Sequence, residues 1–397
     1  MRTLAADHVV SASSSMPGAF IQPAQRSARV FNALILLTFA IPFTMYFVHT
    51  FFSGNQVWQY LIFLVPFIGS LAGAHVFATT YLYFDRELPA GISQSVLKLA
   101  IIPLGIVVVN VFAVTALPLQ ALVWFMVFYA HYAMFHFGRQ NVGVLSFSFL
   151  STGQGPLTVT EKRIVNAVTV CGMCGALQVF APGLMLDPSR YPFDLRIIQP
   201  AIPILFNVGA GLYAGVIVFA FVYFVRNRRR FGGVRTALYW MCVFWYSGIF
   251  AVPDYPLLHL ALFTTAHGLQ YLVFLGFHAY SSSQFRWQSL RHTPTRETGR
   301  SFCRDLARCG LPALTLLGSI TAAWWIWSNQ SRLFSSAGSL IDQLIVHDGV
   351  LKLGVGFTLG LTMAHYWVDQ HIFRFKSPER RKWLMQRYPF LAASQNV

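Results

Sequence analysis

Ten apolar segments, each about as long as a helix that crosses a membrane, recur along this chain of 397 residues. The hydrocarbon core of a bilayer requires about 20 apolar residues per helix. We place these segments near residues 31–52, 57–83, 96–115, 119–137, 163–186, 197–225, 236–252, 257–280, 310–328 and 348–373. In lipid, a segment of this length satisfies its backbone polar groups as a helix. The pattern therefore predicts an all-α bundle of about ten transmembrane helices.

The composition supports one membrane domain and few aqueous parts. Only 11% of the residues are charged and the mean hydropathy is +0.54, whereas soluble domains carry about 25% charged residues. We expect a flexible N-terminal tail over residues 1–30, a membrane domain over 31–373 and a basic C-terminal tail over 374–397. The net charge of +16 comes from arginines beside apolar segments. That position indicates contact with the lipid bilayer rather than with nucleic acid.

Lysine and arginine fall almost entirely on one side of the predicted spans. With the N-terminus inside, the inner segments hold 25 of these residues, whereas the outer segments hold only Arg190, Arg196 and Arg332. Cytoplasmic loops carry such an excess of positive charge. One missed span would invert every later loop, so the asymmetry supports the span count and predicts that both termini are cytoplasmic. We expect a multi-pass protein of a bacterial inner membrane.

Histidines and an aspartate interrupt the apolar segments at similar depths. The clearest example is HYAMFHFGRQ, residues 131–140, which follows directly on an apolar run. Ionisable groups inside a bilayer are costly and are usually kept for function. With the topology above, the candidates fall in the middle to inner layer of four helices. The sequence therefore predicts a metal site built from His75, His131, His136, His267, His278, His365 and Asp369.

Helical spacing restricts how these residues can share one ion. His365 and Asp369 are four residues apart and therefore lie on one helix face. His131 and His136 are five residues apart, which is about 140° around a helix. Both can bind the same ion only if the helix ends or bends at FGRQ, residues 137–140.

The eighth segment offers a second set of candidates. His267, Gln270 and Tyr271 share one helix face, so Gln270 and Tyr271 are expected to contact a ligand or the substrate. His278 lies on the same face but about 16 Å further along the axis. We therefore expect His278 to serve a second metal or the substrate entrance.

Two polar residues follow His136 within one helical turn. Gln140 is four residues beyond His136, so it is expected to support that imidazole. Arg139 has two readings, which the sequence leaves open. It is either an anchor at the inner membrane surface or a residue that binds an anionic group of the substrate.

Imidazole and carboxylate ligands with open coordination positions suit non-haem iron and oxygen chemistry. We therefore expect an iron-dependent oxygenase or related oxidoreductase, with a lipophilic small molecule as substrate and a cytosolic electron donor. Haem with two axial histidines would use the same residues. A transporter or channel with a histidine proton relay is a further alternative, as is a scaffold protein without catalytic activity.

The segment FHFG, residues 135–138, resembles the bacterial Brp/Blh family of membrane carotene-cleaving dioxygenases. The resemblance implies a polytopic, histidine-rich enzyme that uses iron. The general layout is also similar to the integral-membrane desaturases and hydroxylases, whose histidines lie on the cytoplasmic side. Both resemblances imply an oxidoreductase.

Overall fold

The computed structural model describes residues 21–52, 75–76, 79, 97–184, 200–253, 256–281, 349–373, 378–388 and 390–391. Every regular element within these ranges is a helix, which confirms the predicted all-α class. Three of the described helices are long and apolar enough to cross a membrane, and they span Gln25–Val48, Leu97–Ala116 and Ala201–Arg226. Their presence supports the prediction that this is a membrane protein. Two predicted spans, 310–328 and nearly all of 57–83, lie outside the described residues.

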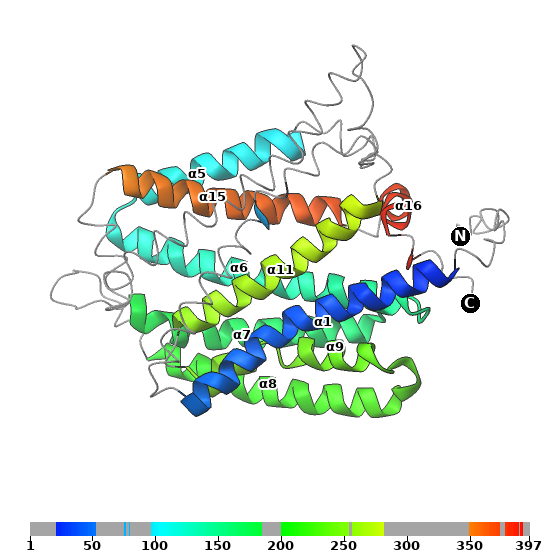
Figure 1. The fold of residues 1–397 in the computed structure, drawn as a ribbon. Coiled ribbons are helices and arrows are strands. Elements are labelled where there is room, and N and C mark those ends of the chain that lie inside the picture. The colour runs from blue at the N-terminus through cyan, green and yellow to red at the C-terminus, as the bar shows by residue number, and fades with distance from the viewer. Residues whose placement is uncertain are drawn as a thin grey trace, which may run out of the picture.

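The long helices lie side by side (Figure 1). They are α1 (Ile21–Phe52), α5 (Ile102–Ala116), α6 (Leu119–Ser151), α7 (Val159–Leu184), α8 (Ala201–Arg226), α11 (Pro256–Ser281) and α15 (Gly349–Ile372). Shorter elements complete the described part: a π-helix η2 (Leu97–Ile101), a 3-10 turn η4 (Arg228–Arg230), α9 (Val234–Val243), α10 (Ser247–Ala251) and α16 (Pro378–Arg387). The most extensive helix pairings are α5 with α15 and α7 with α8.

Two glycines of α15 bring its backbone against α5. A Cβ atom added at Gly356 would lie 2.7 Å from Val111 Cα, and one added at Gly360 would lie 2.7 Å from Val107 Cα. Only glycine fits such a contact, and this spacing of small residues is typical of tightly packed membrane helices. The pairing matters for function because α15 also carries His365 and Asp369.

Helix α6 differs from the prediction at its C-terminal end. The predicted span ended near residue 137, but the helix continues to Ser151. No proline interrupts residues 138–151, and the chain leaves the helix shortly before Gly153 and Gly155, which have positive φ. FGRQ therefore lies within the helix, and the predicted end of the span at residue 137 was wrong.

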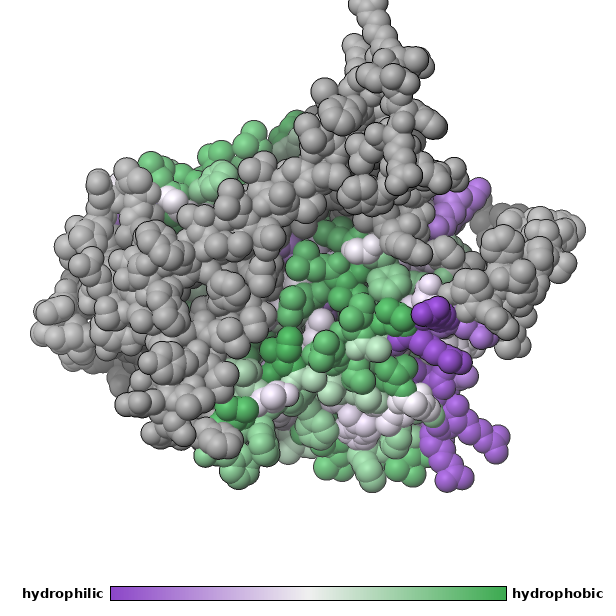
Figure 2. All heavy atoms as spheres, in the orientation of Figure 1, coloured by the Kyte–Doolittle hydropathy of each residue, from purple (hydrophilic) through white to green (hydrophobic). Residues whose placement is uncertain are grey.

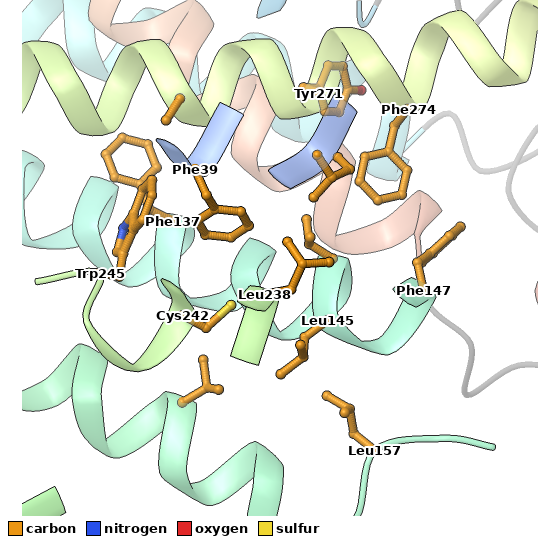
Figure 3. Packing of buried hydrophobic residues seen from close by; sticks show 14 of the residues in the cluster. Phe39, Phe137, Leu145, Phe147, Leu157, Leu238, Cys242, Trp245, Tyr271 and Phe274 are labelled. Carbon is orange, nitrogen blue, oxygen red and sulfur yellow. The ribbon is translucent and has the colours of Figure 1, made fainter. Parts of the chain in front are cut away.

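The predicted span 236–252 is divided in two. Helix α9 ends at Val243 and α10 begins at Ser247. Between them Trp245 and Tyr246 are buried, and Tyr246 donates a hydrogen bond to the backbone carbonyl of Met134, 2.7 Å away on α6. Figure 3 shows Trp245 packed close to Phe39 and Phe137 in the core. Burial of these two large rings explains why the segment breaks.

Parts of both predicted tails are ordered in helices. Helix α1 begins at Ile21, nearly three turns before the predicted span. Helix α16 lies within the predicted C-terminal tail, yet Trp383 and Leu384 on it are buried. Just beyond it, the Tyr388 hydroxyl donates to the Phe274 carbonyl over 3.1 Å. The C-terminal segment therefore completes the core.

Helix α7 begins at Val159, four residues before the predicted span, and its first turn is fixed by side-chain hydrogen bonds. The Glu161 backbone N–H donates to Thr158 Oγ1 over 3.1 Å, and the Thr158 N–H donates to Glu161 Oε2 over 2.6 Å. This reciprocal pair is a capping box. Arg230 also binds Glu161, with its Nε 3.1 Å from Oε1. The end of α8 is thereby tied to the start of α7.

Apolar side chains cover the visible flank of the described helices, whereas hydrophilic side chains gather at one end (Figure 2). The exposed arginines at that end are Arg226, the last residue of α8, and Arg228 and Arg229 just beyond it. The first turns of α1 and the helix α16 lie toward the same end of the bundle (Figure 1). This distribution of charge is expected for helices embedded in lipid.

Candidate metal centre

Helix α15 supplies the two residues with which the site begins. His365 and Asp369 are one turn apart, and His365 Nε2 lies 3.2 Å from Asp369 Oδ2. His136 comes from α6, and its Nε2 lies 3.9 Å from the same carboxylate oxygen. All three side chains are buried or nearly so. One carboxylate thus faces two imidazoles from different helices.

Two further imidazoles complete the group. His75 meets His365 with ring centroids 4.6 Å apart, and it meets His267 of α11 at 4.8 Å. His267 also meets His136, at 4.9 Å. We call the five residues His75, His136, His267, His365 and Asp369 the histidine–aspartate cluster. The chain brings them together from four separate segments.

The potential ligand atoms are close enough for one metal ion. Those of His75, His267 and His365 lie within 4.8 Å of one another, and so do those of His136, His365 and Asp369. Ligands on opposite sides of one ion are about 4 Å apart, because each bond is roughly 2.0–2.2 Å long. Small rotations of the side chains would therefore suffice for binding.

A hydroxyl group determines which nitrogen of His365 faces the cluster. Thr79 Oγ1 donates to the His75 carbonyl over 3.0 Å and lies 2.6 Å from His365 Nδ1. A hydroxyl has one hydrogen, so its oxygen accepts from Nδ1–H. The lone pair of Nε2 then points at Asp369 Oδ2, and two acceptors 3.2 Å apart need a proton or a metal ion between or beside them. Metal-binding histidines are commonly oriented in this way.

Unsatisfied nitrogens support the same interpretation. Both ring nitrogens of His136 and both of His267 are buried without a hydrogen-bond partner in the described part of the chain. Each such group costs about 1–3 kcal/mol, so buried polar atoms are nearly always paired. A bound metal ion would satisfy one nitrogen of each ring. The residues present therefore fit a metal ion.

His259 shows what a structural histidine looks like in this protein. It is fully buried, its Nδ1 lies 2.6 Å from the Tyr46 hydroxyl, and its Nε2 lies 2.7 Å from the Val252 carbonyl. Both nitrogens are used within the fold. The contrast with His136 and His267 separates a packing role from a binding role.

Aromatic side chains hold the imidazoles in place. Tyr366 stacks on His136 with ring centroids 3.9 Å apart, and Phe137 lies 4.8 Å from His267. Gln140 lies elsewhere than predicted: its Nε2 donates to Gln270 Oε1 over 2.9 Å and approaches the His267 carbonyl at 3.1 Å. Gln140 and Gln270 therefore tie α6 to α11.

Two predicted ligands lie outside the cluster. His131 Nδ1 bonds the Val127 carbonyl over 2.7 Å on its own helix. Because α6 continues without a break, His131 faces about 140° away from His136. His278 contacts Trp383, with ring centroids 5.3 Å apart, and so packs beneath α16.

Arg139 and Tyr271 line a cavity beside the cluster. The cavity has a volume of about 330 Å³ and reaches His136 and Asp369 at the metal-binding end. Its walls come from α6, α11 and α15 and include Phe147, Phe274 and Phe373. Figure 3 shows Tyr271 and Phe274 on α11, with Phe147 facing them from below. Cavities of this size hold small ligands.

Thr79 and Tyr366 were not among the residues predicted from the sequence. Thr79 carries a usable signal, because it follows His75 by four residues and so shares its helix face. Tyr366 carries none, because an aromatic residue next to a histidine is common in membrane helices. Comparison with protein-family models, curated proteins and solved structures gave no match. The resemblance at FHFG therefore stays a prediction.

Proposed function

We propose that the protein is a membrane oxidoreductase of the iron-dependent oxygenase class, acting on a lipophilic substrate at the histidine–aspartate cluster. The supporting observation is that four buried histidines and one aspartate converge beside an apolar cavity. Imidazole and carboxylate ligands are those of non-haem iron(II) oxygenases. Iron, when bound, would supply the activation of dioxygen. The FHFG resemblance points in the same direction, since His136 belongs to the cluster.

One ion per chain fits the proposal best. His365 belongs to both potential ligand sets, but its Nδ1 is engaged by Thr79. Only Nε2 is left to bind metal, and one lone pair serves one ion. Asp369 contributes the negative charge, and His136 lies where the cavity meets the cluster. A lipophilic substrate in the cavity would therefore lie next to His136.

The proposal includes the membrane topology predicted from the sequence. About ten spans with both termini in the cytoplasm would place the cluster toward the inner face of a bacterial inner membrane. The hydrophilic end seen in Figure 2 and the position of α1 and α16 toward it support this orientation. A cytosolic donor would then supply electrons from the side on which the arginines gather.

The alternatives are less well supported. A haem between two axial histidines would require the imidazoles to move apart. Their ring centroids lie only 4.6–6.0 Å apart for the pairs that include His365. A proton relay is usually a chain of groups along a path across the membrane. Here the polar groups form one compact cluster, which favours a metal ion.

Metal analysis of the purified protein tests the proposal. We expect about one iron per chain, and we expect His136→Ala or His365→Ala to remove most of it. Matched controls lie on the same helices: His131→Ala on α6 and His371→Ala on α15 should keep the iron, because each imidazole bonds a backbone carbonyl of its own helix. Iron retained by His365→Ala, or a Soret band, would refute the assignment.

A further inference from the structure

The cavity beside the histidine–aspartate cluster has a charged part and an apolar part. Arg139 lies three residues after His136 on the same face of α6, about 4.5 Å further along the axis. Gln370 lines the same region from α15. Further along α6 in the same direction, beyond Arg139, the wall becomes aromatic at Phe147. This division suggests a ligand with a polar head and a hydrocarbon body.

Arg139 carries a positive charge that faces the cavity's polar part. No described residue forms an ion pair with it. Asp369, the acid that lines the cavity, faces His365 and His136 instead. The Arg139 side chain is exposed, so a ligand can reach it from outside. A guanidinium binds one carboxylate with two parallel hydrogen bonds, whereas a doubly charged phosphate would call for more than one cation.

The apolar part is a cage of phenylalanines. Phe147 and Phe274 meet at a ring-centroid distance of 4.8 Å, and Phe373 lies 6.1 Å from Phe274. From His136 to Phe147 the cavity follows α6 for about 16 Å, at 1.5 Å per residue. Gly143 lies on this path, and a Cβ atom added there meets nothing within 4 Å. A single hydrocarbon chain fits such a path.

We infer that the cavity binds a lipophilic monocarboxylic acid, with its carboxylate at Arg139 and its hydrocarbon chain directed toward Phe147 and Phe274. The carbons next to the carboxylate then lie nearest His136 and Asp369. This inference rests on the proposed function only in assigning the ligand as the substrate. It names the substrate class and states which end of the molecule faces the metal.

Binding of palmitic acid and its methyl ester to the purified, full-length protein tests the inference, with iron content measured on every sample. We expect the acid to bind more tightly than the ester. Arg139→Gln should weaken binding of the acid about tenfold or more, because hydrogen bonds to charged groups are the stronger ones, and should leave the ester unchanged. Arg229→Gln, in the exposed arginine turn after α8, is the control that should alter neither.

Gly143→Leu probes the apolar path. The new side chain enters open space, so the fold should persist, and both the acid and the ester should bind more weakly. Equal affinity for acid and ester, or unchanged binding in Gly143→Leu, would overturn the inference, as would tighter binding of lysophosphatidic acid than of palmitic acid.

The two proposals can fail separately. Normal iron content without palmitate binding would overturn the substrate assignment and leave the metal centre standing. Selective palmitate binding in a protein that takes up no metal would support the acid-binding cavity and refute the oxygenase.

Photocrosslinking gives an independent check on the orientation. Palmitic acid with a diazirine near its carboxylate should label the peptide around His136 and Arg139. The same acid with a diazirine at its far end should label peptides that contain Phe147 or Phe274. The reverse pattern would show that the chain lies the other way round.

Discussion

A single hydroxyl group orients His365 within the histidine–aspartate cluster. Thr79 donates to the His75 carbonyl and accepts from His365 Nδ1. It thereby links the His75 backbone to the His365 imidazole and leaves Nε2 of His365 available as a ligand. Groups in this position contribute strongly to metal affinity although they do not touch the metal.

Thr79→Val should therefore weaken iron binding by about 10–100-fold, which is the usual effect of removing such a partner. The substituted side chain has nearly the same shape, so the fold should be retained. Competition with a chelator of known affinity measures the change. Thr79→Ser keeps the hydroxyl and should bind iron normally; equal affinity in Thr79→Val would show that another group orients His365.

Membrane depth and helical spacing were enough to place all five clustered side chains among the candidates and to pair His365 with Asp369. They could not decide between His131 and His136, because that choice depended on where α6 ends. They also predicted that Gln140 supports His136, whereas the Gln140 side chain bonds Gln270. Hydrogen-bond direction between helices depends on their mutual rotation, which one sequence does not contain.

At the scale of the element, α15 is the helix on which the site depends most. It carries His365 and Asp369 on one face and contacts the α5 backbone through Gly356 and Gly360. Backbone contact leaves little freedom for the helix to slide or rotate. The positions of His365 and Asp369 are therefore set partly by Gly356 and Gly360, which lie outside the histidine–aspartate cluster.

Gly360→Leu should destabilise the protein by about 3 kcal/mol or more and lower its iron content. Overpacking alone typically costs 1–3 kcal/mol, and here the added side chain meets backbone atoms that cannot move aside. Thermal unfolding in detergent measures the loss. Gly354→Leu lies on the same helix where a Cβ meets nothing within 4 Å, so its stability should stay near that of the unchanged protein.

Helix positions were predictable where apolar length alone marks them, as for α7, whose bounds Val159–Leu184 lie within a few residues of the predicted span 163–186. Boundaries were wrong where tertiary contacts decide them. Helix α6 continues past residue 137 because the apolar pattern continues, and α9 ends early because Trp245 and Tyr246 enter the core. Local sequence carries the first kind of information and lacks the second.

At the scale of the whole molecule, the histidine–aspartate cluster joins parts of the chain that are far apart in sequence. His136 on α6, His267 on α11 and His365 on α15 approach one another from three long helices. An ion bound there would connect all three. Anything that binds only the folded state stabilises it, by about 2.7 kcal/mol at a concentration 100 times the Kd.

Iron should therefore raise the thermal unfolding midpoint, and a chelator should lower it. Tryptophan fluorescence at one fixed heating rate follows the transition. His365→Ala should show the same midpoint with and without iron, which separates binding at the cluster from binding elsewhere. An equal iron-dependent shift in His365→Ala would place the stabilising ion at another position.

The placement of α16 has a consequence for biosynthesis. Trp383 on α16 and Tyr388 just after it pack against the core next to His278. The last predicted membrane span supplies His365 and Asp369. During synthesis the chain makes His75, His136 and His267 well before His365, Asp369 and α16. An ion held by the whole cluster could therefore bind only after α15 has been made, and a variant cut before α15 should take up little iron.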